Sequence, residues 1–170
     1  NNDEVIETTN NSETSRKNEV PIDISKKITK ELLANMSGVK WAKKKEACEK
    51  LEKILIDANM KILPTGLNDL FDVFKQKLSD GNKNGVKILI SLLKKLIEAL
   101  KTSFKQWTKP IALSLIPTLA DQSPIIRNEC VSCLDVWVKY VGIESLINHF
   151  NIFLKNENVE MRIEILKILK

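Results

Sequence analysis

A motif that returns about every 40 residues constrains the fold of this chain more than any other feature. Each copy has a last apolar residue, a turn rich in acidic, amide or glycine residues, and then an apolar residue close to a cation. Clear copies occupy 78–87, 119–127 and 154–162, 36–44 is a looser copy, and the closing cations are Lys44, Lys87, Arg127 and Arg162. A period of this length indicates a chain built from stacked supersecondary units.

Between the motifs, apolar residues recur at steps of three and four from Ile24 to Leu169, which places them on one face of a helix. These stripes predict eight helices, paired as about 24–58, 64–100, 110–141 and 144–170. One pair cannot cover its own apolar face, so the pairs must stack. The sequence therefore predicts an all-α HEAT-repeat solenoid of four antiparallel helix pairs, with all the intra-pair turns in a row on one edge.

The helix breakers support this reading. Only 5 Gly and 5 Pro occur among 170 residues, which disfavours a turn-rich sandwich or barrel. Pro117 lies inside the fifth helix and should kink or shorten it. The other breakers mark predicted helix ends: Pro64 and Pro110 in first turns, Ser123 and Pro124 as N-cap and first residue of the sixth helix, and Gly142 just after its end.

Charge divides the chain into two parts. Residues 1–20 are rich in Asn, Ser, Thr and Glu and carry a net charge of −3, while the formal charge of the whole chain is +5. A segment of this composition cannot bury enough apolar surface to offset its ordering entropy, so we expect 1–20 to be a disordered linker. The remainder, 21–170, is a basic domain, and such a domain favours an acidic partner.

The usual signatures of chemistry do not assemble in this sequence. One His and three Cys cannot build a two-His zinc site, and Cys130 and Cys133 lie mid-helix on an apolar stripe, which is typical of core packing. No phosphate-binding glycine loop, framed carboxylate pair or membrane-length apolar run occurs. We therefore expect no catalysis, cofactor, metal or membrane span, and the cysteine usage favours a reducing compartment.

Trp41 stands out because it lies in the first turn, among Lys40, Lys43, Lys44 and Lys45, and off the stripe that starts at Ala47. Tryptophan is enriched at binding hot spots, so this indole could anchor a partner. It could equally fold back and cap the open end of the solenoid, and the periodicity does not distinguish between these two roles. The other two tryptophans are predicted to pack: Trp107 in a connector on the opposite edge, and Trp137 in the core.

At these residues the chain resembles a TOG domain, from about Ile24 to its last residue. The resemblance rests on Trp41-Ala-Lys-Lys44-Lys-Glu-Ala47, on Leu78 to Val86, on Ile116 to Arg127, and on Trp137. It implies a flat, monomeric paddle that binds αβ-tubulin or microtubules, in a regulator of the cytoplasmic cytoskeleton and spindle. The implied tubulin contacts are Trp41, Lys44, Asn82, Lys83, Val86, Arg127 and Arg162.

The chain also departs from that family. TOG domains generally have six helical pairs, so four pairs suggest a truncated domain or part of a longer polypeptide. The third turn has Gln122, Ser123 and Pro124 where many tubulin-binding members carry lysine. This favours an alternative, a HEAT-repeat scaffold for a different protein partner. A nucleic-acid binder is a third hypothesis, disfavoured because aromatic residues make up only 5% of the chain and form no stacking array.

Overall fold

A computed structural model describes residues 20–170 as an all-α solenoid, which confirms the predicted fold class. The linker predicted over 1–20 lies, except for Val20, outside the described residues. Within 20–170 there are eight α-helices and three short 3₁₀ segments. The α-helices are α1 (Lys30–Ser37), α2 (Trp41–Asp57), α3 (Asn68–Lys77), α4 (Lys83–Leu100), α5 (Thr108–Leu115), α6 (Pro124–Val141), α7 (Glu144–Phe153) and α8 (Val159–Ile168), and the 3₁₀ segments are η1 (Ser25–Lys27), η2 (Lys101–Trp107) and η3 (Ile116–Ala120).

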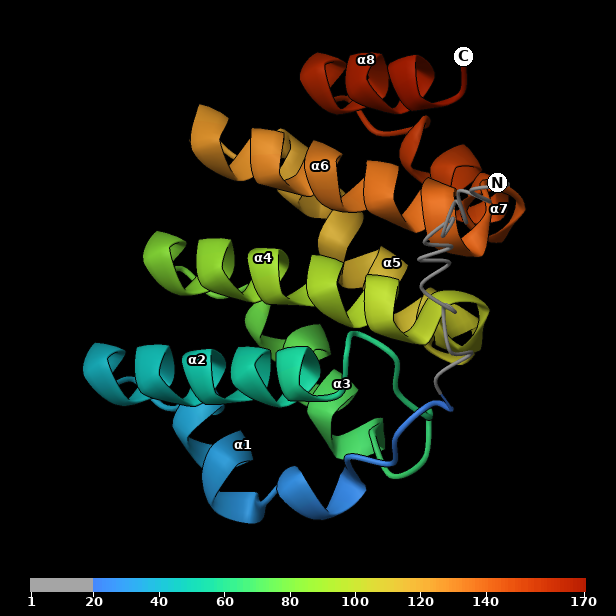
Figure 1. Ribbon diagram of the computed structural model, residues 1–170. Coiled ribbons are helices and arrows are strands. Elements are labelled where there is room, and N and C mark those ends of the chain that lie inside the picture. The colour runs from blue at the N-terminus through green and yellow to red at the C-terminus, as the bar shows by residue number, and fades with distance from the viewer. Residues whose placement is uncertain (1–19) are drawn as a thin grey trace, which may run out of the picture.

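The helices form two layers. In Figure 1, α2, α4, α6 and α8 stack one above another, with the N-terminal ends of α2, α4 and α6 on the same side. Each of these helices packs on the next, and α1, α3, α5 and α7 pack in the same order behind them. The turns within the four pairs therefore share one edge. We call it the turn edge and number its turns 1 (38–40), 2 (78–82), 3 (121–123) and 4 (154–158).

Most of the predicted helix ends are confirmed. Ser123 is the N-cap of α6 and Pro124 its first residue, and Gly142 ends α6 at a φ of 101°, where any Cβ would be strained. Helix α5 stops at Leu115, and the chain continues as the 3₁₀ segment η3 around Pro117, because proline has no N–H for the α-helical ladder.

Two predicted helix starts are wrong. Pro64 does not open a helix, because α3 begins only at Asn68. Between them, Gly66 has a φ of 68°, which is not a right-handed helical conformation. The first helix does not run from Ile24 either. After η1, α1 begins at Lys30, where the hydroxyl of Thr29 accepts a hydrogen bond of 3.1 Å from the N–H of Leu32.

The core contains a chain of aromatic contacts from α3 through η2 to α6. Phe71 stacks on Trp107 with ring centroids 4.2 Å apart, and Phe104 meets Trp137 edge to face at 4.8 Å. Both indole N–H groups find acceptors, Trp107 at Asn68 Oδ1 and Trp137 at Ser145 Oγ. The packing roles predicted for these two tryptophans are confirmed.

The described cysteines are part of the same core. Cys48, Cys130 and Cys133 are buried free thiols, and burial raises the pKa of Cys130 to about 12. A thiol with so high a pKa is a poor nucleophile at neutral pH. The core-packing interpretation of Cys130 and Cys133 is confirmed.

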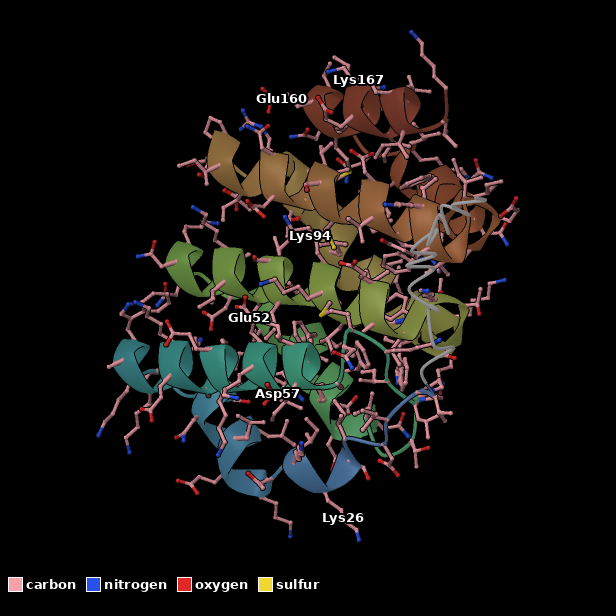
Figure 2. All side chains as sticks on the ribbon, in the orientation of Figure 1. Lys26, Glu52, Asp57, Lys94, Glu160 and Lys167 are labelled. Atoms are coloured by element: carbon pink, nitrogen blue, oxygen red, sulfur yellow. The ribbon has the colours of Figure 1, made fainter. Side chains whose placement is uncertain are left out.

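Ion pairs join successive repeats across the front layer. The carboxylate of Glu52 on α2 binds Lys95 on α4, and Lys94 Nζ lies 3.0 Å from Glu129 Oε2 on α6. Figure 2 shows Glu52 between α2 and α4, and Lys94 between α4 and α6. These pairs help to hold the turns in register. In the part of the chain that the structure describes, no helix combines the length and apolarity that crossing a bilayer requires.

Candidate functional site

The turn edge is built by a backbone device that recurs in turns 2, 3 and 4. In each, an acidic or amide side chain accepts a hydrogen bond from the backbone N–H two residues later, an Asx turn. The three bonds join Asp80 to Asn82 at 3.4 Å, Asp121 to Ser123 at 2.8 Å, and Asn156 to Asn158 at 2.9 Å. The acidic or amide residue of the sequence motif is therefore structural, and it sets where the next helix begins.

Helix caps complete turns 2 and 4. The side-chain oxygen of Asn82 accepts from the N–H of Gly85 at 3.2 Å, and that of Asn158 accepts from Met161 at 2.8 Å. Asn82 was expected as a partner contact. The structure gives its oxygen a capping role, while the residue as a whole stays exposed on the edge.

Turn 1 lacks both devices. The equivalent positions hold Gly38 and Lys40, and Lys40, the N-cap of α2, makes no side-chain cap bond. Trp41 follows as the first residue of α2 and is 41% exposed. It borders a hollow of about 350 Å³ with Asn84, Lys87, Ile88, Ser91 and Glu129. Since the other lining residues belong to α4 and α6, the indole faces along the edge and does not cover the open end beside α1.

Two of the expected contact residues are buried, which corrects the sequence expectation. Lys44 is only 3% exposed and Val86 only 2%. The reason is helical spacing. Lys44 lies three residues before buried Ala47, and Val86 lies three before buried Leu89, so each falls on the apolar stripe of its own helix. Neither side chain forms the exposed contact surface that the sequence suggested, and Val86 does not form an exposed ridge with Trp41.

Turn 3 is a network of charges. The carboxylate of Asp121 binds the ammonium of Lys83 from turn 2, and Arg127 Nη1 donates to the carbonyl oxygens of Asp121 at 2.7 Å and Gln122 at 3.1 Å. Burial raises the pKa of Asp121, but hydrogen bonds from Lys83 and the Ser123 N–H, with the charge of Arg127, outweigh it and hold the pKa below its usual value. Arg127 therefore organises turn 3.

The fourth motif cation is also partly enclosed. Arg162 on α8 is half-buried, and its Nε has no hydrogen-bond partner among residues 20–170. Its neighbour Glu160, at the start of α8 in Figure 2, lies 3.7 Å from Arg127 Nη1 across the repeat boundary. The third and fourth motif cations thus lie where the last two repeats meet.

Sequence reasoning missed Lys87 and Ile88, which border the Trp41 hollow. The signal for Lys87 was available, because Lys87 is the cation of the second motif copy and its side chain is exposed. Ile88 could be found only from the structure, because its place beside the Trp41 hollow depends on how α2 packs on α4.

No family model matches this chain. Curated relatives do. The chain is 29% identical over 135 residues to Protein MOR1 of rice, and 31% identical over 132 residues to Protein MOR1 of Arabidopsis thaliana. It is 29% identical over 119 residues to Centrosomal protein 224 of Dictyostelium discoideum. The matches cover 79%, 78% and 69% of this chain but only 7%, 7% and 6% of the relatives, so the chain corresponds to a small part of each.

Solved structures share the fold. A structure concerned with microtubule plus-end tracking by XMAP215, CLIP-170 and EB1 matches with a TM-score of 0.76 and 21% identity, over 88% of this chain and 62% of the other. A structure of microtubule polymerases with TOG domain arrays gives 0.75 at 21% identity, over 88% and 31%. The crescerin TOG domain array gives 0.67 at 21%, over 85% and 59%. The resemblance to a TOG domain is confirmed at the level of the fold.

Proposed function

Since this chain is a HEAT-repeat domain with the TOG fold, we propose that it binds αβ-tubulin through the turn edge, as one module of a microtubule-regulating protein. Its similarity to two MOR1 proteins, a centrosomal protein and, at 22% identity, the mini spindles protein of Drosophila supports a place on the cytoplasmic and spindle microtubules. The role is recognition of a protein surface, without catalysis.

The exposure of Trp41 carries this proposal. Its indole borders a hollow on the turn edge, and the neighbouring Lys40, Lys43 and Lys45 are exposed. A half-exposed tryptophan ringed by cations combines an apolar anchor with charges that steer an acidic partner. The start of α4, directly after turn 2, adds Lys83 and Lys87, so the edge carries lysines from two repeats.

A scaffold that binds a different protein through the same edge is the second candidate. It is favoured by turn 3, where Gln122 takes the place of a lysine and Arg127 is engaged by backbone carbonyls. Size-exclusion chromatography of the 170-residue chain with purified tubulin separates the two. Co-elution supports the tubulin proposal, whereas no co-elution together with capture of other proteins supports the scaffold.

Two variants then test the edge itself. Trp41→Ala should weaken tubulin binding by roughly 30-fold, the loss expected for a hot spot. Lys83→Glu should weaken it too, and more at low salt. Ile56→Ala and Lys105→Glu are matched controls, because both residues are exposed and lie away from the turn edge. Unchanged binding in both test variants, with circular dichroism showing intact folds, would refute the assignment of tubulin to this edge.

A further inference from the structure

The Lys44 side chain is only 3% exposed and packs against the first turn of α4. Among residues 20–170, its ammonium forms no salt bridge and no hydrogen bond. A Cβ added at Gly85, the third residue of α4, would lie 3.2 Å from Lys44 Nζ and 3.5 Å from its Cδ. The cationic tip therefore lies at the N-terminal end of α4, which Figure 1 shows beside that of α2.

This position concentrates positive potential. A helix N-terminus carries a partial positive charge of about +0.5, which adds to the charge of the Lys44 ammonium. The first turn of α4 contains no acidic residue. The carboxylates of turns 2 and 3 are engaged elsewhere, Asp80 with the Asn82 N–H and Lys77, and Asp121 with Lys83.

Hydrogen-bond donors are also available there. The first N–H groups of a helix have no acceptor within the helix, and the Asn82 oxygen takes only the N–H of Gly85. The N–H groups of Lys83 and Asn84 remain. Backbone N–H groups at a helix start, backed by a cation, bind carboxylates and phosphates well. Asn84 also borders the Trp41 hollow, so this turn and the hollow are contiguous.

We propose that the N-terminal turn of α4 is a carboxylate-binding site, formed by the N–H groups of Lys83 and Asn84 and the ammonium of Lys44. Its occupant is an acidic side chain of the protein partner, next to an apolar group that enters the Trp41 hollow. The site follows from the placement of Lys44, while the identity of the partner as tubulin rests on the proposed function. Lys44 thus contributes its charge from beneath the edge, with little exposed surface of its own.

A titration without tubulin tests the site directly. The ¹⁵N-labelled 170-residue chain is titrated with a capped Ala-Glu-Ala tripeptide, and with the matching Ala-Gln-Ala tripeptide as the uncharged control. We expect the glutamate peptide to shift the amide signals of Lys83 and Asn84, saturating with a dissociation constant of about 1–10 mM. The glutamine peptide should leave them unmoved. Shifts spread over all lysine-bearing surfaces, with none at Lys83 and Asn84, would overturn the proposal.

Two variants isolate the role of Lys44. Lys44→Met keeps the aliphatic stem and removes the charge, and should weaken the glutamate peptide roughly tenfold. The matched control is Lys50→Met, on the same helix but exposed, which should bind as the parent chain does. Gly85→Ala keeps the charge but displaces the ammonium, and should weaken binding about threefold or more, even if Lys44→Met fails to fold. Parental affinity in folded Lys44→Met or in Gly85→Ala would overturn the proposal.

The two proposals fail separately. If the chain binds the glutamate peptide at Lys83 and Asn84 but does not co-elute with tubulin, the carboxylate site stands and the tubulin assignment falls. If tubulin co-elutes but the peptide produces no local shifts, the turn edge stands and the carboxylate site falls.

Discussion

Turns 1 and 3 occupy equivalent positions in their repeats but use their charges in opposite ways. In turn 3, Asp121 closes an Asx turn and binds Lys83, while Arg127 holds two carbonyl oxygens. In turn 1, Gly38 and Lys40 fill the positions of Asp121 and Ser123 and close no such bonds. The comparison teaches that a repeated cation has no fixed role. Where a turn supplies acceptors the cation is structural, and where it does not, the charge remains available to a partner.

The largest expected effect lies in turn 3. Arg127→Ala removes the two bonds that the guanidinium donates to the carbonyl oxygens of Asp121 and Gln122, which close the turn. Because hydrogen bonds to charged groups contribute about 1.5–3 kcal/mol, we expect a loss of about 2 kcal/mol in the free energy of unfolding. Urea denaturation monitored by circular dichroism measures it. A loss below about 0.5 kcal/mol would show that turn 3 holds its shape without Arg127.

The next effect depends on pH. Asp121→Asn keeps an oxygen for the Ser123 N–H but loses the charge that binds Lys83, and should cost about 1 kcal/mol near neutral pH. Since the folded-state pKa of Asp121 lies below its ordinary value of 3.8, its contribution is complete above that value and is lost as the pH falls through the folded-state pKa. The difference between parent and variant should thus be constant above about pH 5 and shrink below 3.8. A difference independent of pH down to pH 2 would contradict this role.

A smaller effect of opposite sign is expected from adding to turn 1 the capping side chain that turns 2 and 4 have. The N-cap Lys40 has φ −76° and ψ 106°, close to the −77° and 101° of the capping residue Asn82. Lys40→Asn should therefore cap α2 and stabilise the domain by about 0.5–1 kcal/mol. Thermal unfolding measures it, with Lys45→Asn, inside the same helix, as the control that should not stabilise. An unchanged or lower melting temperature would mean that turn 1 resists capping.

The smallest effect belongs to the free charges of turn 1. Lys43→Ala should change the free energy of unfolding by less than about 0.5 kcal/mol, because Lys43 is exposed and forms no salt bridge with any described residue. If this domain binds tubulin as proposed, the same change should lower the salt dependence of binding. A stability loss as large as that expected for Arg127→Ala would remove the contrast between the two turns.

The repeat and its helices could be predicted because apolar periodicity and helix breakers act locally. The end of the fifth helix before Pro117, the start of α6 at Pro124 and the packing of Trp137 all follow from neighbours within a few residues. The residues of the functional site were harder to predict. Val86 was carried over from family resemblance although its own stripe, shared with Leu89, already predicted burial. The engagement of Lys83 by Asp121 joins residues 38 positions apart, so only the stacking of repeats reveals it.

Pro117 has a geometric consequence for the whole edge. A 3₁₀ helix rises about 2.0 Å per residue against 1.5 Å in an α-helix, so the five residues Ile116–Ala120 carry the chain about 2.5 Å farther than one more α-helical stretch would. The proline therefore works as a spacer. It sets how far the third loop projects, and so whether a carboxylate there can reach across to the ammonium of the loop before it.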